Sequence, residues 1–570
     1  MSRKNSVIIL VIMLFLFCGI GYDVTKKMSP TYDEQNHLTR GIAILKTGDF
    51  RLSFHHPPFA NILSSVPVMI GDNYWWNNSS NKFEENVPSF EPENENFLNI
   101  WTASHETLYK SQEVFDGVKA IKISRLPTLL FAICAALIIF LWTKELFGYI
   151  GAILSTGIFL FDPNIIAHST LTTTDMAATA TILLSVYLLR KYIVRPSWMI
   201  LIACGAAVGV AFLCKFSSLI LLPIFALILL STIKHPKIGK RVLNALWVGI
   251  LMLVIAGFTV WAGYFFKVEK LAAKPGEAFS VQYSGKGNIP VPAKQYMRGI
   301  KTVMVEADGH KAYLNGVTDD TGNGWWYYFP ATFVYKTNWI ALILIAVTTI
   351  LFILPKTRRK IKLPLNETLF LGIPIIIYLL AGFGLLGISL NLGVRHLLPI
   401  YPFIYIFIGA LGVFADFTTK KTRIVTIVTL VTILFSYIAI IALNHPNYLS
   451  YFNLPRGDRY LIDSNYDWGQ ELEKLKDYED ERSSPVYLSY FGTTPPLGVR
   501  VGCRYLPGMG VMSNAKLPES IERPCYVAIS ATCLQGGKVY TGVDYKKFLF
   551  DENAEFVEMI GKTIYIYHID

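Results

Sequence analysis

Residues 242–265 read VLNALWVGILMLVIAGFTVWAGYF and contain no charged side chain. A bilayer core needs roughly 20 consecutive apolar residues to be spanned by one helix, so this stretch predicts a transmembrane helix. Charged residues make up 16% of the 570-residue chain, whereas an ordinary soluble protein carries about 25%. The deficit is concentrated in stretches of this kind, which excludes a soluble multidomain protein.

Further apolar stretches on both sides of this one carry the same signature. They lie near residues 6–22, 125–143, 147–162, 176–193, 198–213, 216–232, 337–354, 367–388, 397–415 and 423–443. The first follows Ser2-Arg3-Lys4 and lacks a small-residue cleavage site, which favours an uncleaved signal anchor over a removed signal peptide. We therefore predict an all-α polytopic membrane protein with about eleven transmembrane helices.

Basic residues in the connections between these stretches predict the orientation. They are Lys144, Arg190, Lys191 and Arg195, and the clusters at 234–241, 356–362 and 420–423. Positive charge favours cytoplasmic loops, so we expect these connections and the N-terminus in the cytoplasm of a cell membrane. The long polar loops at about 23–122 and 266–336, and the C-terminus, then lie outside. The net charge of +11 thus comes from basic residues in the connections between spans, and it does not indicate nucleic-acid binding.

The chain becomes polar after about residue 443 and stays so to its end. Runs rich in β-branched and aromatic residues at 486–491, 526–530 and 563–568 predict strands, and residues 470–478 have a helical pattern. We expect a transmembrane domain over 1–443 and a small extracytoplasmic α/β domain over 444–570. A disulfide between Cys503 and Cys525 is compatible with that location, although Cys533 would then stay unpaired.

Ionisable residues gather where apolar stretches meet the outer side. They are Asp33, Glu34, Arg125, Asp175, Lys215, Arg395 and His396, with His56 in the first long loop. A charge held in the hydrocarbon costs at least about 2.5 kcal/mol unless it is paired, so each is a candidate functional residue. Each also has a structural explanation, such as an ion pair between Asp175 and Arg125 or a solvated loop around Asp33. Their gathering at one membrane face favours a shared site.

The cations and the carboxylates at this face suit two different steps of a group transfer. Lys and Arg at a membrane surface suit a phosphate, especially one tethered to a lipid. A carboxylate beside them can take the proton of a hydroxyl group, which is a weak nucleophile until it is deprotonated. The residues therefore indicate transfer of a group away from a lipid phosphate, which is a good leaving group once cations neutralise it.

An ordered set of motifs resembles the protein O-mannosyltransferase-like glycosyltransferases of the GT-C superfamily. The motifs are Tyr32-Asp-Glu34 with His37 and Gly41, Gly48-Asp49, His56-Pro-Pro58, Ser124-Arg-Leu126, Asp162-Pro-Asn164 to Thr174-Asp175, Cys214-Lys-Phe-Ser217 and Gly393 to Pro399. The likeness covers about residues 1–443, and residues 463–470, DSNYDWGQ, are similar to a motif of bacterial members with an outer domain. No MIR-type domain is recognisable in 266–336, which argues for a prokaryotic member.

The resemblance implies a role for each candidate residue. Asp33 matches the catalytic acid proposed as general base, and Glu34 matches its acidic neighbour. The positions suited to the donor phosphate are Lys215, Arg395 and Arg125, and the pocket positions are Asp175, His56 and His396. No cofactor is implied with certainty. A divalent ion on Asp33, Glu34 and His37 or His56 stays open, because related enzymes differ on this point.

The implied reaction is inverting transfer of a mannose-like hexose from a polyprenyl-phosphate carrier to a protein Ser or Thr hydroxyl, at the outer membrane face. A lipid or cell-envelope glycan is the alternative acceptor, since related aminoarabinose transferases modify lipid A from the same type of carrier. A non-enzymatic flippase or transporter would place charges near the bilayer midplane and often shows repeats, which the sequence lacks. A non-catalytic scaffold would not need acids and cations gathered at one face.

Overall fold

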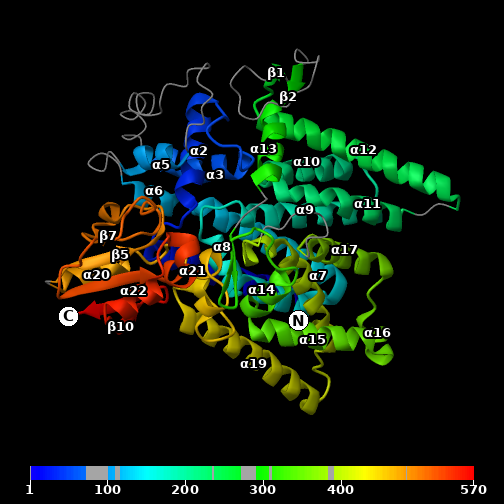
Figure 1. Cartoon of the computed structure of the whole chain (residues 1–570). Helices are drawn as coiled ribbons and strands as arrows, with labels where there is room; N and C mark the ends of the chain where they lie inside the picture. The colour runs from blue at the N-terminus through cyan, green and yellow to red at the C-terminus, as the bar shows by residue number, and fades with distance from the viewer. Residues whose placement is uncertain are drawn as a thin grey trace.

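The chain folds into a helical membrane part and a smaller C-terminal α/β unit, which Figure 1 shows side by side. This computed structural model describes residues 2–71, 100–109, 116–233, 236–270, 290–306, 311–382, 391–482 and 484–570. The Trp/Asn/Glu-rich piece from Asn73 to Glu95 of the first long loop lies outside these residues.

Six helices among the described residues are long and apolar enough to cross a membrane. They are α1 (Arg3–Lys27), α7 (Leu126–Leu160, continuous with α6, Gly117–Ser124), α9 (Asp175–Val194), α12 (Ile238–Gly263), α17 (Leu365–Gly382) and α19 (Lys420–Asn444). A seventh span results if α14 (Tyr328–Lys336) and α15 (Trp339–Ile353), which meet at a 110° bend, are taken together. The chain is therefore a multi-pass membrane protein, as predicted.

Shorter apolar helices occupy the remaining predicted spans. They are α10 (Trp198–Cys214), η1 (Phe216–Ile220) with α11 (Leu221–Thr232), and α18 (Tyr401–Ile408) between the 3-10 turns η3 (Leu398–Ile400) and η4 (Gly409–Phe414). A further apolar helix, α3 (Phe59–Gly71), lies in the first long loop, where no span was predicted. Because several of these are shorter than a usual span, the number eleven stays a prediction.

Helix α7 contains two of the predicted spans, which are separated by a chain reversal. Gly148 has a left-handed φ of 76°, a conformation that glycine adopts without a Cβ clash. Leu10 packs in one cluster with Phe140 and Ala152, which lie on either side of this glycine. An unbroken helix would separate the last two residues by roughly 18 Å, so the chain doubles back at Gly148.

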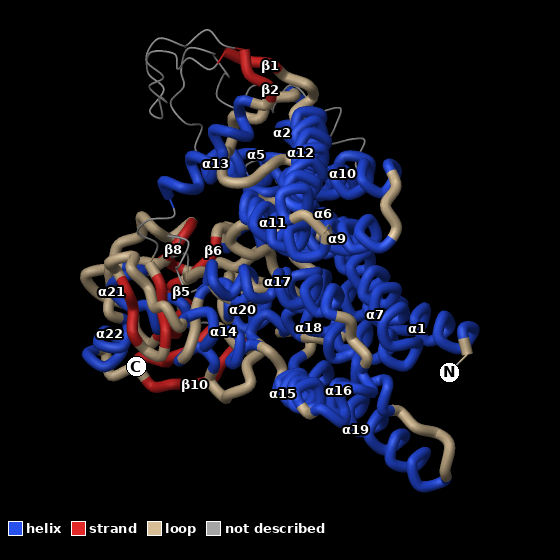
Figure 2. Tube along the Cα trace, turned by 90° about the vertical axis from the view of Figure 1, so that its right-hand side faces the viewer, coloured by secondary structure: helices blue, strands red, loops and turns tan. Residues whose placement is uncertain are grey.

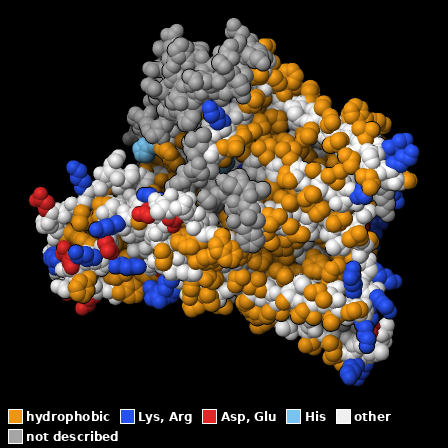
Figure 3. Space-filling view, turned by 45° about the vertical axis from the view of Figure 1, so that its right-hand side comes forward, with side chains coloured by type: hydrophobic (Ala, Val, Ile, Leu, Met, Phe, Trp, Pro, Cys, Tyr) orange, Lys and Arg blue, Asp and Glu red, His pale blue; other side chains and the backbone are white. Residues whose placement is uncertain are grey.

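Three of the basic connections, those near Lys144, Arg190 and Arg358, lie together at one end of the helices. Arg190 donates from Nε to Glu367 Oε2 at 2.7 Å and from Nη1 to Glu145 Oε2 at 2.6 Å, which joins α9, α17 and the turn in α7. Phe147 and Ile361 share an apolar cluster, which brings the basic helix α16 (Pro355–Ile361) to the same end. Figure 3 shows the broad hydrophobic surface of the helical part, with Lys and Arg side chains gathered at its margin.

The C-terminal unit is built on a five-stranded sheet in the order β10-β11-β9-β5-β7. Its strands are β5 (Val486–Ser489), β7 (Arg504–Tyr505), β9 (Cys525–Ser530), β10 (Glu555–Ile560) and β11 (Ile564–Ile569). Its helices are α20 (Lys474–Asp480), α21 (Ala531–Thr541) and α22 (Tyr545–Asp551). The three predicted strands are confirmed. Figure 2 shows the sheet gathered at one side of the molecule. Cys503 and Cys525 are both free thiols, so the structure does not contain the disulfide considered above.

Small two-stranded sheets and short helices complete the fold of the described residues. The sheets pair β1 (Val268–Lys270) with β2 (Pro290–Pro292), β3 (Ala312–Leu314) with β4 (Val317–Asp319), and β6 (Phe491–Gly492) with β8 (Met509–Gly510). The helices are α2 (Glu34–Thr47), α5 (Ile100–Tyr109), α8 (Pro163–Ser169) and α13 (Lys294–Glu306), with the 3-10 turns η2 (Val394–His396), η5 (Tyr448–Ser450), η6 (Gly457–Arg459), η7 (Asp463–Asn465) and η8 (Pro496–Val499).

The C-terminal unit docks on the start of the first long loop through backbone hydrogen bonds. Tyr32 N–H donates to the Trp468 carbonyl at 3.0 Å, and Ser29 N–H donates to the Gln470 carbonyl at 2.9 Å. The Thr493 hydroxyl donates to the Tyr32 carbonyl at 2.7 Å. These contacts hold the segment before Asp33 against residues 463–470. The division of the chain at residue 443 stays a prediction, although α19 ends at Asn444.

Candidate active site

Asp33 and Arg395 meet at the end of the helices opposite the basic connections. Asp33 is the residue before α2, and Arg395 lies in the turn η2 that precedes α18. Arg395 Nη1 donates to Asp33 Oδ2 at 3.1 Å, and both side chains are partly buried. Burial alone would lower the pKa of Arg395, but the carboxylates of Asp33, Asp175 and Asp463 raise it. The Arg395 guanidinium is therefore a stable cation.

Lys215 and Asp175 form a second ion pair, which is more deeply buried. The helix α10 ends at Cys214, and the extended backbone of the next residue, Lys215, interrupts the apolar run and leaves the ammonium group at the break. Its Nζ lies 2.5 Å from Asp175 Oδ1, at the first turn of α9, where the helix dipole favours a carboxylate. The side chains of Lys215 and Asp175 are 12% and 2% exposed.

The two ion pairs belong to one cluster. Asp175 lies within electrostatic range of Arg395, His168 and His396 as well as Lys215. Helix α9 runs from this cluster to Arg190 at the basic end, a rise of roughly 22 Å. The structure therefore brings together five of the predicted residues, namely Asp33, Asp175, Lys215, Arg395 and His396.

Three buried histidines line the same region, and burial lowers the pKa of each. Burial lowers the pKa of His56 well below its ordinary value, and the nearby His37 and Lys215 lower it further. Burial also lowers the pKa of His168 to about 3. His37 and His56 pack with ring centroids 4.9 Å apart, and His37 Nδ1 lies 3.1 Å from Asn61 Oδ1. This places the predicted residue His56 beside Lys215.

Several buried polar atoms around the cluster have no hydrogen-bond partner among the described residues. They are Nδ1 of His56, Nε of Arg395 and both ring nitrogens of His168. A buried polar atom without a partner costs about 1–3 kcal/mol, so such atoms are uncommon unless a ligand or water satisfies them. Unsatisfied polar atoms beside two ion pairs are the property expected of a polar binding site.

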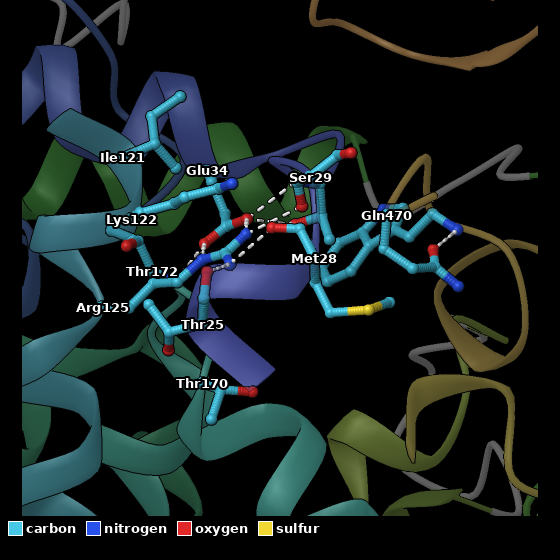
Figure 4. Close-up of polar contacts among 12 residues, drawn as sticks. Thr25, Met28, Ser29, Glu34, Ile121, Lys122, Arg125, Thr170, Thr172 and Gln470 are labelled. Carbon is cyan, nitrogen blue, oxygen red and sulfur yellow. Dashed lines mark hydrogen bonds and ion pairs between the residues drawn. The ribbon is translucent and has the colours of Figure 1, made fainter. Parts of the chain in front are cut away.

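Glu34 and Arg125 form a separate ion pair that supports the first loop. Figure 4 shows the Arg125 guanidinium enclosed by Glu34 and by the carbonyls of Thr25, Met28 and Ser29. These partners use all of its N–H groups. The two side chains are 1% and 0% exposed. Arg125 thus has no donor left for a phosphate.

Both oxygens of Glu34 are likewise engaged. Oε1 accepts from the backbone N–H of Thr172 at 2.7 Å, and Oε2 accepts from that of Thr31 at 2.7 Å, in addition to Arg125. Glu34 is therefore not placed to act as a base or as a ligand of a divalent ion. Among the residues that the structure describes, no group of three His, Cys, Asp or Glu is arranged to hold a metal ion.

Residues 463–470 contribute side chains to the candidate site. The sequence identifies this segment as a motif but predicts no role for its residues. The Trp468 ring lies under Arg395, with 4.8 Å between its centroid and Cζ. Asn465 Oδ1 accepts from Val394 N–H at 2.9 Å. Gly393 has a φ of 98°, and a Cβ there would lie 2.2 Å from Asn465 Oδ1, so this close approach requires glycine. The motif thus fixes the turn that carries Arg395.

Asp463 and His168 are the other residues that sequence reasoning missed. Asp463 has a left-handed φ of 58°, and it lies within electrostatic range of Asp33 and Arg395. Burial raises the pKa of Asp463 to about 6, although Arg395 opposes the shift. His168 lies within the motif at residues 162–175, but a histidine among serine, threonine and apolar residues gives no signal of its own.

Comparison with known proteins supports the predicted relationship. Residues 113–261 match the family model of the dolichyl-phosphate-mannose-protein mannosyltransferases. A chain of the S. cerevisiae protein O-mannosyltransferase Pmt1-Pmt2 complex, solved with its sugar donor bound, aligns with 91% of this chain and 96% of its own, with a TM-score of 0.50 and 10% identity.

Two further solved structures align over most of the chain at lower TM-scores. ArnT from Cupriavidus metallidurans covers 100% of this chain and 98% of its own, with a TM-score of 0.46 and 14% identity. The oligosaccharyltransferase AglB from Archaeoglobus fulgidus covers 99% and 74%, with a TM-score of 0.46 and 12% identity. No curated protein sequence matches the chain significantly.

The family match and the likeness to the yeast enzyme agree with the architecture described above. At 10% identity the structural likeness establishes the fold, and the family model covers less than half of the chain. The chain is a polytopic membrane protein with the GT-C glycosyltransferase fold and protein O-mannosyltransferase-like features.

Proposed function

We propose that this protein is an inverting glycosyltransferase that moves a sugar from a polyprenyl-phosphate carrier to an acceptor hydroxyl on the outer side of the membrane. The observation that carries the proposal is the contact between Asp33 and Arg395 beside the buried pair of Lys215 and Asp175. One cluster thus contains a carboxylate that can take a proton and cations that can bind a phosphate.

In the proposed reaction the proton of the acceptor hydroxyl passes to Asp33. The acceptor oxygen forms a bond to C1 of the sugar while the bond from C1 to the phosphate oxygen breaks. The electron pair of that bond leaves on the phosphate, whose charge Arg395 and Lys215 neutralise. Direct displacement at C1 inverts the anomeric configuration. No general acid is needed, since the neutralised phosphate is a good leaving group.

The ion pair between Asp33 and Arg395 couples donor binding to base action. Only 3.1 Å separates Arg395 Nη1 from Asp33 Oδ2, so a donor phosphate that bonds to Arg395 competes with Asp33 for the guanidinium. That competition releases the carboxylate toward the acceptor. Nε of Arg395, which has no hydrogen-bond partner in the described part of the chain, supplies a further N–H for the phosphate.

The proposal also specifies which sugar is transferred and which molecule accepts it. We propose a mannose-like hexose and a protein Ser or Thr hydroxyl, which the match of residues 113–261 to the protein mannosyltransferase family model supports. A lipid or cell-envelope glycan is the alternative acceptor. Lys215 and Arg395 lie in the same end cluster rather than at the middle of a span, which favours an enzyme over a flippase.

We further propose that the cluster faces outside and the basic end faces the cytoplasm of the cell membrane. Single cysteines beside Asp33 and beside Arg358, in a cysteine-free background, test this orientation. An impermeant maleimide added to intact cells should label the first and spare the second, and labelling beside Arg358 would reverse the assignment.

The acceptor is tested with membranes that contain the protein and radiolabelled polyprenyl-phosphate mannose. We expect label in the protein fraction, released by alkaline β-elimination, and no label with the Asp33→Asn variant. Label in the lipid or glycan fraction would assign the alternative acceptor. Equal labelling with wild type and Asp33→Asn would contradict the proposed function.

A further inference from the structure

A cavity of about 880 Å³ lies outside the Asp33 cluster, between the β3–β4 hairpin and the helices α21 and α22. None of the predicted site residues lines it. Its size falls within the usual range for small-molecule sites, about 300–1,000 Å³. It is therefore a second candidate binding site on the outer side, and its lining indicates what it binds.

Aromatic rings form much of the cavity wall. Tyr313, Tyr335, Tyr460 and Tyr567 line it, and the rings of Tyr335 and Tyr460 pack with centroids 5.1 Å apart. A tyrosine ring offers an apolar face for the C–H side of a sugar ring and a hydroxyl for hydrogen bonding. The Tyr335 hydroxyl already donates to Asn315 Oδ1 at 3.1 Å, which holds this part of the wall in place.

The charged residues that line the cavity are all cations. They are Arg456, Arg459 and Lys546, and no Asp or Glu is among its described lining residues. Asp458 stands between the two arginines in sequence, but it is fully buried and accepts from the Tyr565 hydroxyl and from Gln535 Nε2, both at 2.7 Å. A concave wall with charge of one sign attracts an anion.

We infer that this cavity binds an anionic saccharide. The apolar faces of the tyrosine rings suit the rings of a saccharide, and the cations suit a carboxylate or phosphate group attached to it. A purely apolar lipid chain would offer no anionic group to Arg456, Arg459 and Lys546, and a bare anion would not use the tyrosines.

Two short stretches of chain connect the cavity with the candidate active site. Tyr460 of the cavity lies only three positions before Asp463 of the active-site loop. Tyr335 precedes Lys336, whose Nζ donates to the Asn465 carbonyl at 2.6 Å. Resting on the proposed function, this juxtaposition assigns the bound saccharide to the acceptor, whose far end the cavity would hold while its hydroxyl reaches Asp33.

The inference is tested by calorimetric titration of the purified full-length protein in detergent. The probes are tetragalacturonate, neutral maltotetraose, glucose 6-phosphate and inorganic phosphate. Tetragalacturonate should bind saturably and at least about 10-fold more tightly than maltotetraose, as expected for charge-assisted hydrogen bonds. Comparison of glucose 6-phosphate with the uronate separates a phosphate from a carboxylate as the preferred anion.

Matched variants locate the binding. Lys546→Glu and Arg459→Glu should each weaken tetragalacturonate binding about 10-fold or more, and Tyr460→Leu should weaken binding of both tetrasaccharides. Lys547→Glu, next to Lys546 on α22 but outside the cavity lining, should retain wild-type affinity. Melting temperatures verify that the variants fold.

Several results would overturn the inference. They are equal affinity for acidic and neutral tetrasaccharides, equal effects of Lys546→Glu and Lys547→Glu, or inorganic phosphate binding as tightly as glucose 6-phosphate. Failure of every probe to bind would overturn it as well. None of these results touches the proposed function, because polyprenyl phosphate binding at Arg395 and Lys215 is measured separately as a shift in melting temperature.

Discussion

Arg395 Nη1 lies 3.1 Å from Asp33 Oδ2, although 362 residues separate the two in the chain. The first loop and the turn before α18 therefore meet at one point. The C-terminal unit also contacts this pair, because the Trp468 ring packs against the Arg395 guanidinium. The candidate site is thus made by three distant parts of the sequence, and each part can be tested on its own.

Loss of Lys215 should abolish the response to the donor's lipid phosphate. Lys215→Ala leaves the Asp175 carboxylate buried without its partner, so stability should fall with or without donor. The double variant Lys215→Met with Asp175→Asn removes both charges and should recover stability. If Lys215 binds phosphate, neither variant gains the rise in melting temperature that polyprenyl phosphate gives the wild type. A full rise in the double variant would leave Lys215 with a structural role only.

Arg125 should be needed for stability and not for donor binding. Arg125→Ala leaves Glu34 as an unpaired buried charge, and breaking such a pair costs about 3–5 kcal/mol. We expect a lower melting temperature in detergent, while the folded fraction binds polyprenyl phosphate with wild-type affinity. A variant that stays stable but loses that affinity would return Arg125 to the donor site.

Trp468 should act as a positioning residue for Arg395. Trp468→Leu removes a desolvated cation–π contact worth about 2 kcal/mol, so donor use (kcat/KM) should fall roughly 10- to 30-fold. Trp468→Phe keeps a ring face and should restore most of the activity, which loss of packing alone does not explain. Equal kinetics for the Leu and Phe variants, at equal stability, would dismiss the contact with Arg395.

Asp463 should make the protein less stable as pH rises from about 4 to 6. Burial raises the pKa of Asp463 from 3.8 to about 6, so in this window the folded state holds a proton that the unfolded state has released. Folding stability from this group is present below pH 3.8 and is lost as pH approaches 6. The difference in melting temperature between wild type and Asp463→Asn should change across this window. A pH-independent difference would show that Asp463 titrates normally.

The membrane class and the strands of the C-terminal unit could be predicted because both depend on local patterns. Apolar length alone identifies a span, and alternating β-branched and aromatic residues identify a strand. The reversal in α7 could also be predicted from the sequence, because Lys144 and Gly148 separate two apolar runs. The number of helices that cross the whole membrane could not be predicted as well, because short helices such as α10 and α11 have the same apolar composition as longer ones.

The candidate site was predicted in part. Asp33, Asp175, Lys215 and Arg395 stood out as charges beside apolar runs, and such charges need a partner or a ligand wherever the chain places them. Composition could not decide which cation pairs with which acid: Arg125 was paired with Asp175 as the structural alternative, whereas its partner is Glu34. Trp468 could not be placed, because its contact depends on how the C-terminal unit docks.

The most direct test of the account is single-turnover release of polyprenyl phosphate by the purified protein from polyprenyl-phosphate mannose, with acceptor present. Asp33→Asn keeps the shape of the side chain and removes the basic oxygen, so release should slow by about 10²-fold or more while donor affinity is largely kept. Asp49→Asn, in the same loop but paired with Arg51, should release at the wild-type rate. Release by Asp33→Asn at the rate of Asp49→Asn would contradict the central claim.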